Sequence, residues 1–257
     1  MAVDAAVEIV DEPTEGRVFR SEGRVRLGDV TPSGRLRLDA LARYLQDVAN
    51  DDAVDAQLPG AMFWVVRRTL VEVHRSPVLR EAFELRTFCG GIGSRWAERR
   101  TSLIGADGGR VECSVLWVCV DEASMRPARV PPEFSEHYGA AARDRKVRAR
   151  LQLPDPPDGA PRSTWPMRAV DLDVLGHMNN AAYWAPVEEE IARRGMRRRV
   201  RAELEYLSGI EPGEQVTVET CDHDGGFRLW LRSGTEVEAR AQVVERVEPA
   251  ALSSDRA

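Results

Sequence analysis

The chain has 257 residues, 43% hydrophobic and 30% charged, which is the composition of a globular protein with enough residues for one large domain or two smaller ones. Its net charge of −6 argues against general nucleic-acid binding, and no apolar run approaches the roughly 20 residues of a membrane-spanning helix. The acidic start, MAVDAAVEIVDEPTEG, lacks the features of a signal peptide, so we expect a cytoplasmic protein that binds neither membrane nor nucleic acid.

The first half of the chain predicts one helix followed by four strands. Residues 17–30 suit an extended lead-in, and apolar side chains then recur at helical spacing in residues 37–56. The expected strands cover residues 68–75, 82–88, 96–104 and 110–120. The last of them is apolar on both faces toward its end, which is typical of a strand in the middle of a sheet.

A proline-rich stretch at residues 151–166 breaks regular structure and predicts a linker. The segment CDHDGG, residues 221–226, brings metal-binding residue types together, but the spaced partner ligands of a metal site are missing. Its Asp and Gly residues favour a hairpin turn instead. The order of elements after the linker repeats the first half, with a helix expected at residues 181–195 and strands at residues 200–207, 214–220, 227–232 and 236–247.

The two halves also match at the start of each helix, where DVTPSGRL (residues 29–36) aligns with DLDVLGHM (residues 171–178). At this spacing of 142 residues (176 − 34), the paired positions are Gly34 and Gly176, Thr31 and Asp173, and Arg35 and His177. A helix followed by antiparallel strands, present twice, predicts an α+β fold of two tandem hotdog domains, each an antiparallel sheet wrapped around a long helix. One chain would then build the unit that single hotdog domains form by dimerising, so we expect a monomer or a homodimer.

The second copy of the turn carries an acid and a histidine, and the first copy carries neither. Asp173 would act as a general base on water or attack directly, and His177 would orient the water or a carbonyl group. Gly176 would let the backbone approach a substrate. Asn179 or Asn180 would cap the following helix, whose first free N–H groups stabilise an oxyanion. These groups suit hydrolysis of a thioester; the alternative is a polar turn in which the same side chains bond local amides.

The chain resembles the acyl-acyl-carrier-protein thioesterases of plants and bacteria over most of its length. The segments that carry the resemblance are GDVTPSGRLRLDALARYLQDVANDDA, FWVVRRTLVEV and GSRWAERRTSLIGADGGRVECSVLWVCVDEASMRPARVPPEF in the first half, and DLDVLGHMNNAAYWAPVEE and LEYLSGIEPGE in the second. The resemblance implies a tandem hotdog enzyme of fatty acid biosynthesis that releases fatty acids from acyl carrier protein (ACP), with no metal and no organic cofactor. It also implies acyl-chain selection in an N-terminal domain, residues 1–150, and catalysis in a C-terminal domain, residues 167–257, on either side of the linker at residues 151–166.

The family's motif, carried over by position, places catalytic residues at Asp173, His177, Asn179 and Asn180. Two positions depart from the plant pattern, because Leu175 stands where plant members have an asparagine and Gly209 where they have a glutamate. Glu189 or Glu211 would supply a second carboxylate, with a surface charge as the alternative for both. Substrate contacts are expected at Gly176, Trp64 and Tyr44, with core packing as the alternative for the two aromatic residues.

The basic run RRGMRRRVR predicts docking of the acidic carrier protein through Arg197, Arg198 and Arg199, with a solvated helix end as the alternative. The leading hypothesis is therefore a thioesterase that hydrolyses fatty acyl-ACP. An acyl-CoA thioesterase is the second hypothesis. A non-catalytic acyl-binding hotdog protein is the third, and Leu175 and Gly209 favour it.

Overall fold

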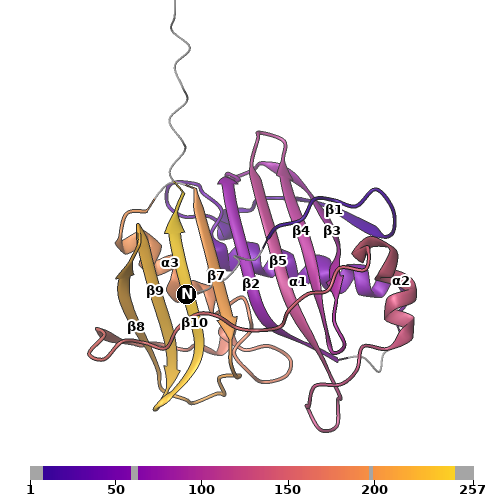
Figure 1. Cartoon of the computed structure of the whole chain (residues 1–257). Coiled ribbons are helices and arrows are strands. Elements are labelled where there is room, and N and C mark those ends of the chain that lie inside the picture. The colour runs from indigo at the N-terminus through magenta and orange to yellow at the C-terminus, as the bar shows by residue number, and fades with distance from the viewer. Residues whose placement is uncertain (1–7, 59–62, 197–198, 247–257) are drawn as a thin grey trace, which may run out of the picture.

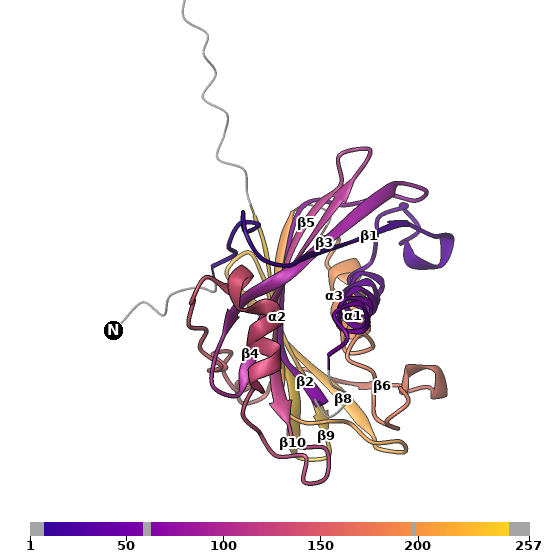
Figure 2. The ribbon, with the colours of Figure 1, turned by 90° about the vertical axis from the view of Figure 1, so that its right-hand side faces the viewer.

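The computed structural model describes residues 8–58, 63–196 and 199–246, which form one long sheet with helices on both of its faces (Figures 1 and 2). The first half contains β1 (Val18–Arg24), the short 3-10 helix η1 (Leu27–Asp29), α1 (Leu38–Asp55), β2 (Phe63–Arg75), β3 (Ala82–Ile92), β4 (Trp96–Gly105), β5 (Arg110–Val120) and α2 (Pro132–Ala142). The second half contains β6 (Arg162–Trp165), the 3-10 helix η2 (Ala169–Asp171), α3 (Trp184–Arg193), β7 (Val200–Tyr206), β8 (Val216–His223), β9 (Gly226–Ser233) and β10 (Glu236–Glu245).

The order of the strands shows the same unit twice. The sheet runs β1-β3-β4-β5-β2-β7-β10-β9-β8-β6, and neighbouring strands within the described residues pair antiparallel, so β2 and β7 meet at the centre. From this junction outward, β5, β4, β3 and β1 on one side correspond to β10, β9, β8 and β6 on the other. The predicted α+β fold of two tandem hotdog domains is confirmed, and β5 lies inside the sheet, as its two apolar faces predicted.

Helices α1 and α3 lie against the same face of the sheet and contact each other (Figure 2). Leu41, Leu45 and Val48 of α1 recur at helical spacing and are buried, as are Val187 and Ile191 of α3. Full burial of one such side chain stabilises the fold by about 1.5–3 kcal/mol. This packing fixes the start of each helix against the middle of the other, which positions the polar turns that precede both helices.

The start of α3 differs from the sequence prediction. The helix begins at Trp184 with Tyr183 as its N-cap residue, so the expectation that Asn179 or Asn180 caps it is wrong. The preceding residues form tight turns instead. Pro186 therefore lies in the first turn of α3, where a backbone N–H has no intrahelical acceptor and the proline removes no helical bond.

The stretch predicted as a linker, residues 151–166, contains the short edge strand β6, which pairs with β8. Before β6 the chain crosses the sheet on the face away from α1 and α3 (Figure 1). It is held there by Trp230, whose Nε1 donates to the carbonyl oxygen of Pro154 at 2.8 Å, and by Glu205, whose carboxylate accepts the N–H of Leu153 at 3.2 Å. The domain limits that the sequence suggested, and the roles assigned to each domain, stay predictions.

The sequence did not predict the strand β6, the helix α2 or the two 3-10 helices η1 and η2. Helix α2 begins at Pro132 and buries Phe134 and Tyr138, four residues apart, so a helix-start proline and an apolar pair were available as signals. The predicted hairpin turn at residues 221–226 is confirmed, since β8 and β9 are joined through Asp224 and Gly225, both at positive φ. None of the helices in the described ranges is long and apolar enough to cross a membrane.

Candidate active site

The two helices are preceded by turns of the same construction, the first-half turn (residues 29–38) and the second-half turn (residues 171–180). In the second-half turn the N–H of Asp173 donates to the carbonyl oxygen of His177 at 2.9 Å, and the N–H of Gly176 donates to that of Asp173 at 3.0 Å. The first-half turn repeats both bonds at the aligned positions, each at 2.8 Å. The structure therefore confirms the register of 142 residues (176 − 34) that the sequence predicted.

The carboxylate of Asp173 bonds its own turn with one oxygen. Its Oδ1 accepts the backbone N–H of Leu175 at 2.9 Å and that of His177 at 3.4 Å. In the first-half turn, the hydroxyl of Thr31 accepts the N–H of Arg35 at 3.3 Å in the same way. The other oxygen of Asp173, Oδ2, has no hydrogen-bond partner among the residues that the structure describes. Asp173 can therefore hold the turn and still offer an oxygen to water or substrate.

The imidazole of His177 lies beside the loop that follows β7. Within the described part of the chain its ring nitrogens make no hydrogen bond, and no ion pair joins it to Asp173. Gly209 is adjacent, because a Cβ built there would lie 3.6 Å from Cγ of His177. A side chain at position 209 would contact the imidazole, so the absence of the plant glutamate directly changes the surroundings of His177.

The loop after β7 is tied to the second-half turn by hydrogen bonds. The N–H of Met178 donates to the carbonyl oxygen of Ile210 at 2.9 Å. The hydroxyl of Tyr183 accepts the N–H of Ile210 at 3.0 Å and donates to the carbonyl oxygen of Ser208 at 3.3 Å. Burial raises the pKa of Tyr183, so this hydroxyl stays protonated and keeps its role as donor. These bonds hold His177 and Gly209 together.

The tip of the second-half turn faces solvent. Val174 and Leu175 are exposed, so the position of the plant asparagine lies at the surface. Gly176 has a φ of +80°, and a Cβ there would meet no atom within 4 Å. The glycine therefore serves the left-handed conformation of the turn, and no close packing around it requires a missing side chain.

The two asparagines at the end of the second-half turn have different surroundings. Asn179 accepts the N–H of Ala181 through Oδ1 at 2.9 Å, which stabilises the tight turn before α3. The carbonyl oxygen of Asn180 accepts the hydroxyl of Tyr206 at 3.1 Å. The backbone N–H of Asn180, in contrast, has no acceptor among the described residues. It is a free donor at the beginning of the helical turns.

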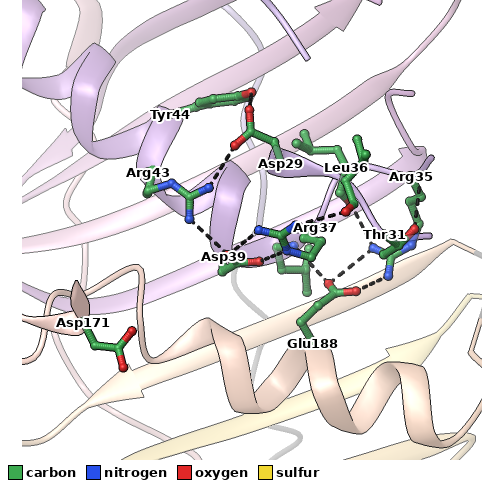
Figure 3. Close-up of polar contacts among 12 residues, drawn as sticks. Asp29, Thr31, Arg35, Leu36, Arg37, Asp39, Arg43, Tyr44, Asp171 and Glu188 are labelled. Carbon is green, nitrogen blue, oxygen red and sulfur yellow. Dashed lines mark hydrogen bonds and ion pairs between the residues drawn. The ribbon is translucent and has the colours of Figure 1, made fainter. Parts of the chain in front are cut away.

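The equivalent donor of the first-half turn is occupied. The N–H of Leu38, which aligns with Asn180 at the same spacing, donates to Oε2 of Glu188 at 3.0 Å. Glu188 belongs to α3 and is also paired with the guanidinium of Arg35, the counterpart of His177 (Figure 3). A carboxylate oxygen thus accepts this N–H in the first half, whereas the equivalent N–H in the second half has no acceptor among the described residues.

Two cavities lie along α1, and only the smaller one is also lined by residues of the second half. The larger, of about 400 Å³, is mainly apolar and lies between the end of α1, the strands β2 to β5, and α2; the predicted substrate contact Trp64 lines it. The smaller, of about 20 Å³, is lined by Asn180 and Tyr206 from the second half. Gln46 and Trp117 line both cavities, so the two cavities are neighbours.

The other predicted contacts lie elsewhere. Tyr44 packs its ring against Phe83, with centroids 5.1 Å apart, and donates its hydroxyl to Asp29 at 2.5 Å, so the structure does not place it in either cavity. Glu189 is exposed on α3, and Glu211 is exposed beyond β7.

Of the predicted docking residues, Arg197 and Arg198 lie outside the described residues. Arg199 lines an open basic pocket of about 870 Å³ beside the first-half turn, together with Arg35, Arg75 and Arg246. The described docking residue therefore lies near the first-half turn.

The comparisons with known proteins agree with this architecture. A family model for the acyl-ACP thioesterase N-terminal domain matches residues 16–138, and the model for the C-terminal domain matches residues 156–245. An uncharacterised protein of Mycobacterium tuberculosis is 30% identical over 240 residues, covering 93% of this chain and 96% of that protein. The chloroplastic dodecanoyl-acyl-carrier-protein hydrolase of Umbellularia californica is 26% identical over 259 residues, covering 86% of this chain and 66% of that protein.

Solved structures show the same fold. The 12:0-ACP thioesterase from Umbellularia californica has a TM-score of 0.76 at 22% identity, covering 91% of this chain and 99% of that chain. An acyl-ACP thioesterase from Bacteroides thetaiotaomicron has a TM-score of 0.72 at 19% identity, covering 88% and 97% respectively. The matched models span most of the chain, and together with the tandem hotdog they show that it belongs to the acyl-ACP thioesterase family.

Proposed function

We propose that the protein is a thioester hydrolase that releases fatty acid from acyl-ACP at the second-half turn. The observation that carries the proposal is the backbone N–H of Asn180, which has no acceptor among the described residues and belongs to a residue that lines the small cavity next to the apolar one. The equivalent N–H of Leu38 is already bonded to Glu188. A donor at this position suits the oxygen of a thioester carbonyl, and the apolar chamber suits its acyl chain. Family membership supports the same chemistry.

In this reaction the acyl chain occupies the larger cavity and the carbonyl oxygen accepts the N–H of Asn180. Oδ2 of Asp173 takes a proton from water, and the hydroxide adds to the carbonyl carbon. The oxyanion that forms is stabilised by the positive end of the helical turns. When the carbon–sulfur bond breaks, the thiolate leaves with the carrier and takes up the proton that Asp173 removed from water, and we assign the relay of this proton to His177. The products are a fatty acid and a free thiol.

The choice of ACP as carrier rests on the family and on the arginines near the end of α3. Arg199 and its basic neighbours give an otherwise negative chain a positive surface for an acidic protein. The acyl-CoA hydrolase is the second candidate, because CoA carries the same pantetheine thiol and its phosphates also suit a basic pocket. The location in the cytoplasm and the role in fatty acid biosynthesis stay predictions.

The test is a free-thiol release assay on matched acyl-ACP and acyl-CoA substrates of several chain lengths. We expect hydrolysis with a higher kcat/KM on ACP, and we expect Arg199→Glu to lower kcat/KM on ACP by about tenfold with a smaller effect on CoA. Equal turnover of both carriers, unaffected by Arg199→Glu, would select the acyl-CoA hydrolase. A protein that binds acyl chains but releases no thiol would exclude the enzyme altogether.

A further inference from the structure

The middle of α1 brings a side chain from the first half to the second-half turn. Glu188 of α3 reaches the start of α1, and the residue that aligns with it at the spacing of 142 (188 − 46) is Gln46. Gln46 and Asn180 line the same small cavity, just as Glu188 and Leu38 share a hydrogen bond. The two residue pairs occupy equivalent positions, but a neutral amide stands in the second half where a carboxylate stands in the first.

Trp117 of β5 supplies a second polar group to this place. Its Nε1 is buried and has no hydrogen-bond partner in the described part of the chain, which is costly for a donor and calls for an acceptor. Trp117 lines both the small cavity and the large apolar one. The small cavity, of about 20 Å³, has room for one oxygen atom with the size of a water.

We propose that Gln46 and Trp117, both from the first hotdog domain, bind the reacting carbonyl oxygen of the thioester together with the N–H of Asn180. This inference rests on the proposed function and assigns part of its machinery to the domain that carries neither Asp173 nor His177. The carbonyl oxygen takes the place in the second half that the Glu188 oxygen takes in the first. The small cavity between the acyl chamber and the second-half turn is then the position of the reacting group.

The chemistry explains why position 46 carries an amide. A carbonyl oxygen has two lone pairs, and the oxyanion of the tetrahedral intermediate has three. Three donors, the N–H of Asn180, the carboxamide of Gln46 and the indole N–H of Trp117, are therefore used together only as the negative charge develops, which favours the transition state over the substrate. A carboxylate at position 46 would instead repel the oxyanion and accept the N–H of Asn180, as Glu188 does for Leu38.

The test compares Gln46→Leu, Trp117→Phe and Gln46→Glu with the wild type on acyl-ACP. Loss of one donor should lower kcat by about 10²-fold, while KM changes by no more than about twofold and the effect is the same for short and long acyl chains. Gln46→Glu should be the least active at neutral pH, and its activity relative to wild type should rise as the pH falls and the new carboxylate becomes protonated. The control Asp47→Leu alters an exposed neighbour on the same helix and should leave kcat unchanged.

The outcomes separate the two proposals. If the wild type hydrolyses no acyl thioester, the proposed function fails before the variants are compared. If the wild type is active and Gln46→Leu and Trp117→Phe, folded by circular dichroism, both keep kcat within about threefold, the inference is wrong. It is also wrong if the variants change the preferred chain length without lowering kcat, because the two residues then only line the acyl chamber. Trp117→Phe keeps an aromatic side chain while removing the N–H together with the pyrrole ring, so it covers the case in which Gln46→Leu does not fold.

Discussion

The first-half and second-half turns share their backbone but differ in what fills them. In the first half, Glu188 of α3 pairs with the guanidinium of Arg35 and accepts the N–H of Leu38, so both of these groups are bound to the other half. In the second half, the counterparts His177 and Asn180 leave an imidazole and an N–H free of partners within the described ranges. The same architecture therefore serves stability in one half and offers a reaction site in the other.

The two turns also differ in the residue that reaches each of them from the other half. Both helices meet across the junction between the halves, so each turn is completed by a residue from the other half: Glu188 for the first and Gln46 for the second. A carboxylate at one of these positions closes the site, and an amide leaves it accessible.

The largest effect is expected from Asp173→Asn. The amide oxygen of asparagine can still accept the two backbone N–H groups of the turn, so the fold is kept, but the group can no longer take a proton from water. We expect kcat on acyl-ACP to fall by about 10²–10⁴-fold. The aligned residue in the first-half turn is Thr31, and Thr31→Val should leave kcat unchanged. Equal losses in both variants would show that the turns act only through the fold.

A change of substrate preference is expected from Ala53→Phe. Ala53 lines the large apolar cavity near the end of α1, and a phenyl ring there would shorten the chamber. The ratio of kcat/KM for short over long acyl chains should rise by about tenfold or more, since a few lost methylene contacts are each worth about 0.8 kcal/mol. The control is Ala192→Phe on α3, which lines the basic pocket beside the first-half turn. If Ala192→Phe moves the chain-length profile and Ala53→Phe does not, the acyl chain occupies the other pocket.

The first-half site should matter for stability instead of activity. Glu188→Ala leaves the Arg35 guanidinium and the N–H of Leu38 without their shared acceptor, so we expect the free energy of unfolding to fall by about 2–4 kcal/mol. Denaturant unfolding measures the loss, and kcat of the folded variant should stay near that of wild type. The double variant Arg35→Met, Glu188→Leu should recover much of the loss, because it removes both charges. A selective loss of kcat in Glu188→Ala would contradict the structural role.

The smallest effect concerns the stability of the fold at low pH. Burial opposes ionisation of Asp171, but the guanidinium and the backbone N–H of Arg168 outweigh it, so the pKa of this carboxyl lies below its ordinary value. A lowered pKa in the folded state gives stability that is present at neutral pH and is lost as the pH falls through the folded pKa, below about pH 4. Arg168 is mostly exposed, so the contribution is about 1 kcal/mol or less. Urea midpoints of Asp171→Asn and wild type should differ at pH 7 and draw together as the pH falls below about 4; a constant difference would exclude this linkage.

Much of the fold was open to prediction because the sequence repeats its own pattern. The spacing between Gly34 and Gly176, with a helix and alternating strands after each, was enough to predict the tandem hotdog, and the hydrogen bonds of the two turns confirm the register. The start of α3 was not predicted correctly, because Asn179 caps a tight turn that precedes the helix. Propensity alone does not distinguish these two uses of an asparagine.

The candidate site was predicted only in the part that is local in sequence. Asp173, His177 and the asparagines lie within a few residues of one another, so one motif contains them. Gln46 and Trp117 come from distant elements, and their closeness to Asn180 depends on how α1 and β5 pack. The spacing of 142 residues (188 − 46) aligns Gln46 with Glu188, and this is the sequence signal for Gln46. The signal has a meaning only once the structure shows the hydrogen bond between Glu188 and Leu38.

The most direct test of the central claim is a crystal structure with a non-hydrolysable acyl-pantetheine analogue, a ketone in which a methylene group separates the carbonyl carbon from the sulfur. We predict that the acyl chain fills the cavity lined by Trp64, and that the carbonyl oxygen lies within about 3 Å of the N–H of Asn180, between Gln46 and Trp117. The first-half turn should keep Glu188 on the N–H of Leu38, with no analogue bound. An analogue bound with its carbonyl group at the first-half turn, or an acyl chain outside the cavity, would contradict the account.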